Sequence, residues 1–360
     1  MRISYNINTV YLIPGDACNL SCTYCSQHEL HGNEQETAVI NPEVFEYIKK
    51  IVRSQDKQLS VVFFGGEPLV YWKQVKEAME QLRGYNIRFS VVSNGTLFNE
   101  EMAKVFNDFN ANLQLSWDGA NVAETRGVDV LKTNRENILK VNRLCLAGVM
   151  SSKNYPLDFV KVCDEFDKEY YPYNGRSRHT AIHFDYIRSD SVPELTDNID
   201  MDKWESQIAK MVEDAIDYKT GKRPYTTAVY QVDKIFKCLR NGQTMKFTAP
   251  RCGSGMTTLH LGINGDIYAC HNDRTVIGDI HNTSLDLIRN VSRLDTTPEI
   301  AKTCDCFDCD AAKLCCNCYY QLSLDARQRY YCELMRRTIK PVQERQDDLN
   351  MAFGTIAAAI

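Results

Sequence analysis

The distribution of cysteine constrains this chain more than any other feature of its sequence. Cysteine occurs 15 times in 360 residues, three times before position 26 and nine times from Cys252 to Cys332. The N-terminus lacks the charged, apolar and small-residue regions of a secretion signal, so we expect a cytoplasmic protein. In a reducing cytosol, thiols bunched at short spacings are typical of metal ligands rather than of disulfides. The chain is therefore predicted to bind metal at both groups.

The first group is Cys18, Cys22 and Cys25, with the spacing C-x3-C-x2-C in one loop. Three thiolates are one fewer than the protein ligands of a fully bound [4Fe–4S] cluster, which would leave one iron open for a small molecule. A structural zinc ion completed by His28 or His31 is the alternative. The spacing alone predicts a metal site of either kind.

Apolar segments and amphipathic segments alternate along the first half of the chain. We expect strands at 8–14, 59–64, 87–93, 112–117, 148–152 and 181–187. We expect helices near 42–53, 71–83, 98–108, 134–146 and 156–169. Repeated strand–helix units indicate an α/β fold with a parallel sheet, either doubly wound or curled into a partial (β/α)6 TIM-like barrel.

Short glycine-rich or polar motifs follow several of the expected strands. They are Gly65-Gly66-Glu67-Pro68, the SNGT segment with Asn94 and the SWDG segment with Ser116. In parallel α/β sheets, functional residues lie in the loops after the carboxyl ends of strands. The three cysteines follow the first strand in the same way, so we expect one site at this edge of the sheet.

The segment CNLSCTYC, with Tyr24 in the aromatic position, and the GGEP motif together resemble the signature of the radical S-adenosylmethionine (SAM) superfamily. The resemblance implies that the open iron of the [4Fe–4S] cluster chelates the amine and carboxylate of SAM. It also implies that reductive cleavage of SAM gives a 5′-deoxyadenosyl radical, with the cofactor supplying the chemistry and the protein orienting it.

The same resemblance assigns SAM contacts to residues at the strand ends. It implies that the backbone at Gly65–Glu67 meets the SAM amine. Asn94 and Ser116 stand where family members contact the ribose and carboxylate, and Arg126 resembles the arginine that pairs with the carboxylate. Ordinary turn and surface roles are the alternatives for these three residues.

The second group of cysteines resembles the SPASM domain, which carries auxiliary [4Fe–4S] clusters in radical SAM enzymes that modify peptides and proteins. The resemblance implies that a first auxiliary cluster is bound by Cys252, Cys270 and Cys318. It implies that a second is bound by Cys306, Cys309, Cys315 and Cys332. Cys304 or Cys316 is available as the missing ligand of the first cluster, unless that position is open to substrate. Zinc ribbons are the alternative for these spacings.

These assignments divide the chain into four expected regions. They are a radical SAM partial barrel at 1–225, a helical bridge at 226–250, the SPASM domain at 251–335 and a helical tail at 336–360. The segment LGINGDIYACHND predicts a hairpin that opens the SPASM domain, with Asn264-Gly265 as its turn.

The candidate base lies beside one of the auxiliary-cluster cysteines. Sulfatase-maturating enzymes of this family carry an aspartate base directly after the equivalent of Cys270, where this chain has His271, with Asp273 two residues on. Histidine can accept a proton near neutral pH. His183 and Asp185 share one face of the sixth expected strand and are candidates either for the substrate cavity or for a structural pair.

The leading hypothesis is a radical SAM maturase that forms a thioether, carbon–carbon bond, epimer or oxidised side chain in a peptide or protein, with flavodoxin or ferredoxin as electron donor. A small-molecule dehydrogenase and a non-catalytic iron–sulfur electron carrier are the alternatives. Only 17 residues precede Cys18, so we expect no winged-helix leader-binding domain. The net charge of −5 and the scattered basic residues predict no nucleic-acid or membrane partner.

Overall fold

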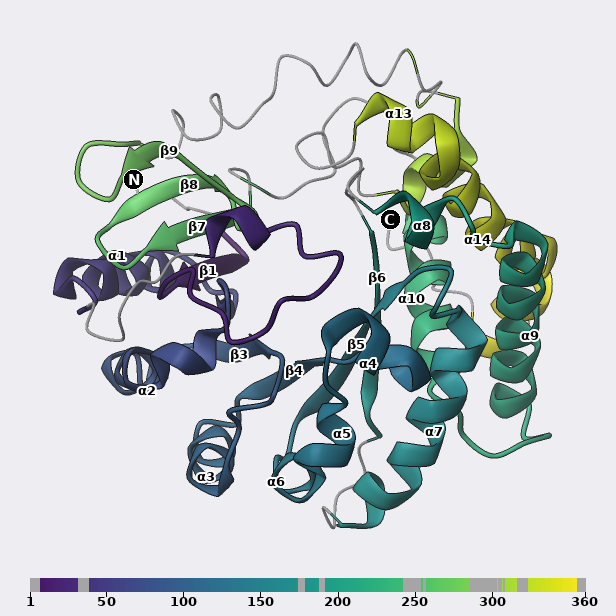
Figure 1. Cartoon of the computed structure of the whole chain (residues 1–360), viewed down its shortest axis with the longest axis horizontal. Coiled ribbons are helices and arrows are strands. Elements are labelled where there is room, and N and C mark those ends of the chain that lie inside the picture. Colours follow the sequence, from purple (N-terminus) through teal and green to yellow (C-terminus); the bar gives the residue numbers. More distant parts are fainter. Residues whose placement is uncertain are drawn as a thin grey trace. The chain divides into compact units, whose positions relative to one another are not determined.

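The computed structural model of the chain describes residues 7–31, 39–173, 179–187, 192–241, 254, 257–284, 303, 306, 308–315 and 323–354. The chain divides into two compact units, both drawn in Figure 1. The first unit comprises residues 1–117, 123–145 and 252–295, and the second comprises residues 118–122, 146–251 and 296–360.

A mixed sheet with the order β4-β3-β2-β1-β7-β8-β9 forms the centre of the first unit. Its parallel strands are β1 (Thr9–Ile13), β2 (Leu59–Phe63), β3 (Ile87–Ser93) and β4 (Asn112–Ser116). β7 (Thr258–Gly262) also pairs in parallel with β1. β8 (Asp266–Cys270) and β9 (Asp273–Asp279) continue the sheet in antiparallel fashion. The predicted hairpin is confirmed, and Gly265 in its turn has φ +100°, a conformation that favours glycine.

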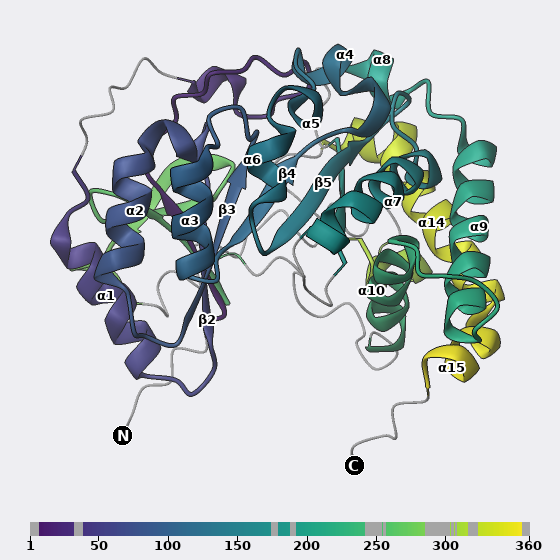
Figure 2. The same cartoon turned by 90° about the horizontal axis from the view of Figure 1, so that it is seen from below.

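Three helices cover one face of this sheet, as Figure 2 shows. They are α1 (Pro42–Arg53), α2 (Trp72–Gln81) and α3 (Glu100–Asp108). α1 begins where its sequence predicts, because the Asn41 side chain accepts a hydrogen bond from the Glu43 amide at 3.0 Å and Pro42 fits the first turn. Its apolar residues at helical spacing, including Ile48, are buried against the sheet.

The segment between β4 and α7 differs from its prediction. The expected helix at 134–146 is the short α6 (Arg135–Leu139), and β5 (Leu144–Met150) begins four residues before the expected strand at 148–152. The run LCLAGVM is continuously apolar, and such a run has no period that separates a buried strand from a buried helix.

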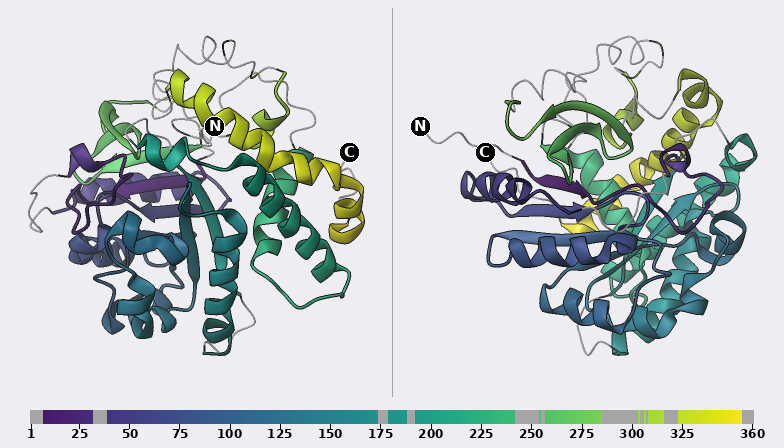
Figure 3. Two further views of the ribbon diagram at one scale, coloured as in Figure 1. Left: turned by 45° about the vertical axis from the view of Figure 1, so that its right-hand side comes forward. Right: turned by 60° about the vertical axis from the view of Figure 1, so that its left-hand side comes forward.

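The second unit is mainly helical. It contains β6 (Ala181–Tyr186), most of β5, α7 (Pro156–Tyr173), α8 (Pro193–Thr196), α9 (Met201–Lys219), α10 (Ala228–Asn241), α14 (Cys332–Glu344) and α15 (Gln346–Phe353). α9 packs against α14, the long yellow-green helix in the left view of Figure 3. Trp204 of α9 is fully buried, and its indole N–H donates to the Thr338 hydroxyl at 2.9 Å. Within the described ranges, every helix is too short or too polar to cross a membrane.

Candidate active site

The predicted cluster cysteines lie in the cysteine loop, which we define as residues 14–31, directly after β1. Cys18, Cys22 and Cys25 are each partly buried. The Leu20 amide approaches Cys18 Sγ at 3.5 Å, and the Cys25 amide donates to the Cys22 carbonyl at 3.1 Å. Burial raises the pKa of the Cys18 thiol to about 11, and the charges of Glu67 and the other two cysteines act in the same direction. A thiolate in this position therefore needs a positive partner.

This donor set fits an iron–sulfur cluster with one open iron. Three soft sulfur atoms come from one loop, and bound iron would supply the positive charge that their burial requires. Across the part of the chain that the structure describes, no three His, Cys, Asp or Glu side chains gather closely enough to hold a single metal ion. Ligation by the three cysteines stays a prediction.

The GGEP motif packs its backbone directly on the cysteine loop. A Cβ atom on Gly65 would lie 2.2 Å from the Gly15 carbonyl oxygen, and one on Gly66 would lie 2.3 Å from the Ala17 carbonyl oxygen. The Glu67 amide donates to the same Ala17 carbonyl at 2.8 Å. Glycine is required at both positions because any side chain would displace the loop that carries the cysteines.

The Glu67 side chain joins the carboxyl ends of β2 and β3. It is 1% exposed, and its Oε1 accepts from the Leu69 amide at 2.9 Å and the Ser93 hydroxyl at 2.8 Å. Its Oε2 accepts from the Asn94 amide at 2.7 Å. Burial raises the pKa of Glu67, while these hydrogen bonds lower it. The Glu67 side chain thus has a structural role, because it ties together the two strand ends that carry the site.

Asn94 connects the end of β3 to the cysteine loop. Its Nδ2 donates to Asn19 Oδ1 at 2.9 Å, and its Oδ1 accepts from the Thr96 hydroxyl at 2.7 Å. Asn19, next to Cys18, also donates to that hydroxyl at 2.7 Å. Ser116 lies partly buried at the end of β4, at the same edge of the sheet. The SAM contacts predicted for Asn94 and Ser116 remain predictions.

Arg126 lies against the cysteine loop at the end of α4 (Val122–Arg126). Its Nη1 is 3.9 Å from Cys22 Sγ, and its guanidinium stands 5.4 Å from the centre of the Tyr24 ring. The Thr23 amide donates to the Thr125 carbonyl at 2.9 Å, which fixes this contact. The structure therefore brings Arg126 to the cysteine loop, and its pairing with the SAM carboxylate stays a prediction.

The candidate base His271 belongs to an aromatic cluster next to Cys270. Its ring stacks on Tyr11 of β1, with centroids 4.4 Å apart and planes 12° apart, and meets Phe64 edge-on at 4.8 Å. His271 Nδ1 is 3.9 Å from Cys270 Sγ. His260 lies beside it, with ring centroids 5.3 Å apart. These ring contacts fix the orientation of the His271 imidazole, and the residue stays partly exposed.

The other candidate polar residues have local partners. Asp273 Oδ1 accepts from the amide and the hydroxyl of Thr275 at 2.8 and 2.7 Å, so this carboxylate shapes the start of β9. In the second unit, His183 Nδ1 is 2.9 Å from Lys234 Nζ of α10. Asp185 Oδ1 accepts from the Tyr186 amide at 2.9 Å. A structural role thus has direct support at Asp273, His183 and Asp185.

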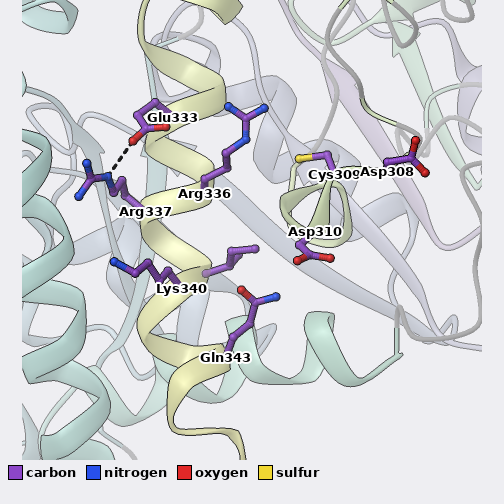
Figure 4. A pocket seen from close by; sticks show the side chains of 9 residues that line it. Asp308, Cys309, Asp310, Glu333, Arg336, Arg337, Lys340 and Gln343 are labelled. Carbon is purple, nitrogen blue, oxygen red and sulfur yellow. Dashed lines mark hydrogen bonds and ion pairs between the residues drawn. The ribbon is translucent and has the colours of Figure 1, made fainter.

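The predicted ligands of the second auxiliary cluster all lie in the second unit. Cys306 and Cys315 are buried, and Cys309 and Cys332 are partly buried. Cys309 precedes η5 (Asp310–Lys313), which packs against α14. Arg336 of α14 and Cys309 line one pocket of about 420 Å³, shown in Figure 4. Burial lowers the pKa of Arg336, but Cys309 and Cys332 raise it, and the net direction is upward.

The first auxiliary site is described only in part. Cys270 is buried at the end of β8. The remaining cysteines assigned or offered to it, Cys252, Cys304, Cys316 and Cys318, lie outside the described residues. Their ligation stays a prediction.

Sequence reasoning missed three residues that hold the cysteine loop. Asp16 and Gln27 stand two positions outside the first and last cysteines, and both bind the β8–β9 turn, which we define as residues 270–274. The third residue is Arg274 in this turn, whose guanidinium forms an ion pair with the Asp16 carboxylate. The only available signal was the polar character of the two bracketing residues, because their partners lie more than 240 residues away along the chain.

Residues 12–146 match the family model described as the Radical SAM superfamily. They contain the end of β1, all of β2 to β4, the cysteine loop and all the residues predicted to contact SAM. This stretch is therefore a radical SAM domain. SAM and a [4Fe–4S] cluster are the cofactors of such a domain, so the predicted superfamily and cofactors are confirmed at this level.

Known proteins that resemble the chain include a radical SAM synthase and sulfatase-maturating enzymes. Radical SAM cyclopropyl synthase TigE of Paramaledivibacter caminithermalis is 26% identical over 162 residues, 39% of this chain and 34% of that protein. The serine-type anaerobic sulfatase-maturating enzyme of Bacteroides thetaiotaomicron is 23% identical over 308 residues, 75% of this chain and 71% of that protein. The chain spans about a third of the length of the curated relatives that it matches first.

A solved structure shares the fold. Native anSMEcpe with bound AdoMet and Cp18Cys peptide matches with a TM-score of 0.64 and 19% identity, over 96% of this chain and 99% of that chain. The predicted fold class, a partial α/β barrel followed by a Cys-rich region, is confirmed by this likeness together with the domain match.

Proposed function

We propose that this enzyme cleaves SAM reductively and uses the resulting radical to modify a peptide or protein substrate. The observation that carries the proposal is the meeting of the cysteine loop, GGEP, Asn94 and Arg126 at the carboxyl ends of β1 to β3 and the nearby α4. GGEP and Asn94 contact the cysteine loop through hydrogen bonds, and Arg126 contacts it through the Cys22 sulfur atom. A site for SAM beside three thiols is what this arrangement supports best.

Cys18, Cys22 and Cys25 would hold the [4Fe–4S] cluster, which when bound supplies the electron that cleaves SAM. Arg126 would neutralise the carboxylate of SAM, a charge-assisted contact for which a guanidinium is suited. The backbone of Gly65 and Gly66 approaches the loop closely enough that no side chain intervenes. Together these residues would orient SAM beside the cluster.

The substrate class rests on the relatives. Their names describe a cyclopropyl synthase and sulfatase-maturating enzymes, and the matched structure holds a peptide. Of the two candidate bases, His271 is the better supported, because Asp273 already accepts two hydrogen bonds from Thr275. His271 would accept a proton from the substrate at an imidazole nitrogen. A flavodoxin or ferredoxin as electron donor remains part of this proposal.

Anaerobic incubation of the reconstituted protein with SAM and dithionite tests the first half of the proposal. We expect 5′-deoxyadenosine and methionine, detected by liquid chromatography and mass spectrometry. The matched control is the Cys18→Ala protein, which should release neither product. Intact clusters without 5′-deoxyadenosine would instead support an electron carrier.

The second half is tested with deuterium in the substrate. A candidate Cys- or Ser-containing peptide with deuterium at the reacting carbon should transfer deuterium to 5′-deoxyadenosine. His271→Gln should lower formation of the modified peptide by about 100-fold or more, the usual worth of a proton-transfer residue, while deuterium transfer continues. Transfer from a small metabolite and never from peptides would contradict the proposed substrate class.

A further inference from the structure

Arg274 fastens the entry of the cysteine loop to the β8–β9 turn. Its Nε donates to Asp16 Oδ1 and Oδ2 at 2.9 and 3.1 Å, and its Nη2 also donates to Oδ1. Its Nη1 donates to the His271 carbonyl at 2.6 Å. One guanidinium therefore holds both the residue two positions before Cys18 and the residue directly after Cys270.

Gln27 fastens the exit of the same loop to the same turn. It is 5% exposed, and its Nε2 donates to the His271 carbonyl at 2.9 Å and to Asn272 Oδ1 at 3.3 Å. The loop that carries the three cysteines is thus held at both ends by the turn that follows Cys270. The carbonyl of His271 accepts from both Gln27 and Arg274.

The Arg274–Asp16 pair is sheltered from solvent. The two side chains are 13% and 20% exposed, and the guanidinium stands 5.5 Å from the centre of the Tyr268 ring. Ion pairs on open surfaces contribute little, but a bidentate pair at this depth fixes geometry as well as charge. Breaking one partner of such a pair leaves an uncompensated charge.

Asp16 is also confined from its other sides. Its neighbour Ala17 donates its amide to the Tyr71 hydroxyl at 3.0 Å, and the Asp16 carbonyl oxygen would lie 2.3 Å from a Cβ atom on Gly66. A shift of Asp16 would therefore also move Cys18, the first cysteine of the loop, which lies two residues further along the chain. Arg274 controls that position through the Asp16 carboxylate.

We propose that Arg274 is a positioning residue that couples the SAM-cluster loop to the turn bearing Cys270, so that the state of each depends on the other. The proposal rests on the proposed function, in which Cys18, Cys22 and Cys25 hold the SAM cluster and Cys270 holds an auxiliary cluster. By linkage, if a cluster bound through Cys270 changes the affinity for SAM, then SAM changes the affinity of that site for its cluster by the same factor.

The test compares SAM affinity in the reconstituted protein with its clusters. Arg274→Gln should weaken SAM binding by about tenfold, the worth of one charge-assisted hydrogen bond, as measured by equilibrium dialysis. It should also change the SAM-induced shift in the electron paramagnetic resonance spectrum of the reduced cluster. Arg274→Lys keeps the charge but loses the bidentate contact. Its SAM affinity should therefore lie between those of the unchanged protein and Arg274→Gln.

Arg83→Gln is the matched control. Arg83 pairs with Glu80 at 3.0 Å, but both side chains are about half exposed and lie away from the cysteine loop. This variant should bind SAM as the unchanged protein does. Equal weakening in the Arg83 and Arg274 variants would overturn the proposal, since a general loss of stability would then explain both.

A double-mutant cycle separates failure of the coupling from failure of the proposed function. Cys270→Ser should weaken SAM binding when Arg274 is present and have a much smaller effect in the Arg274→Gln protein. Additive effects would overturn the coupling. Iron analysis of Cys270→Ser tests the ligand assignment separately, because an unchanged iron content would remove Cys270 from the auxiliary site. Absence of any SAM binding to the unchanged protein would instead count against the proposed function.

Discussion

At the scale of single residues, Glu67 shows how a motif residue serves its site from inside. Both carboxylate oxygens accept hydrogen bonds, from Leu69, Ser93 and Asn94, and the side chain is 1% exposed. The sequence predicts that GGEP belongs to the site, but it cannot predict that Glu67 turns towards β3. That contact depends on how closely β3, the next strand along the chain, approaches the end of β2.

Glu67→Gln should lower the free energy of unfolding by about 1–3 kcal/mol, because one oxygen acceptor becomes an NH2 group that faces N–H donors. The thermal midpoint of the anaerobic protein, followed by circular dichroism, measures this loss. Glu77→Gln on the exposed face of α2 is the control and should leave the midpoint unchanged. Equal midpoints for the two variants would contradict the role given to Glu67.

His260 predicts a pH dependence of stability. Burial lowers its pKa well below 6.5, and the nearby His271 and Arg274 act in the same direction. Below about pH 6.5 the unfolded chain binds a proton at this histidine that the folded chain does not. The folded state therefore loses about 1.4 kcal/mol for each pH unit below that point, down to the folded pKa.

The thermal midpoint should accordingly fall more steeply from pH 7 to pH 5.5 in the unchanged protein than in His260→Gln. Comparison of the two slopes removes the contribution of other titrating groups. His281→Gln is the control, since His281 is exposed on its side chain to 50%. Parallel slopes for all three proteins would show that His260 does not titrate in this way.

At the scale of elements, the cysteine loop is defined by what packs on it. β1, β2 and β3 lie within a residue or two of their predicted bounds, because each is a short apolar run closed by glycine, proline or asparagine. The parallel pairing of β7 with β1 was not predictable, since β7 comes 245 residues after the end of β1. That pairing is what brings Cys270 and His271 to the first cysteine loop.

Gly66→Ala tests the contact between GGEP and the cysteine loop. The added Cβ would lie 2.3 Å from two backbone carbonyl oxygens, so the loop must move. We expect loss of most of the SAM-cluster iron, measured with the absorbance of the reconstituted protein near the iron–sulfur band. Gly84→Ala is the control, because its Cβ meets nothing within 4 Å although Gly84 has φ +82°. Retention of full iron by Gly66→Ala would show that the loop tolerates displacement.

At the scale of the whole molecule, the number of iron–sulfur clusters is the prediction that most separates the alternatives. Three complete [4Fe–4S] clusters require about twelve irons per chain, and the three sets of cysteines assigned to them share no residue. Removal of one set of ligands should therefore subtract about four irons without emptying the others. Cys18/Cys22/Cys25→Ala should retain about eight irons, and Cys306/Cys309→Ala should also retain about eight, by iron and sulfide analysis after anaerobic reconstitution.

Cys145/Cys238→Ala is the control, because it changes two cysteines outside both groups, and it should retain all the irons. About four irons in the first variant would exclude two complete auxiliary clusters, and stoichiometric zinc with no acid-labile sulfide would favour zinc ribbons in the second cysteine group. The spectrum of the first variant also reports on function, because clusters that persist without the SAM site can only accept or relay electrons or bind substrate.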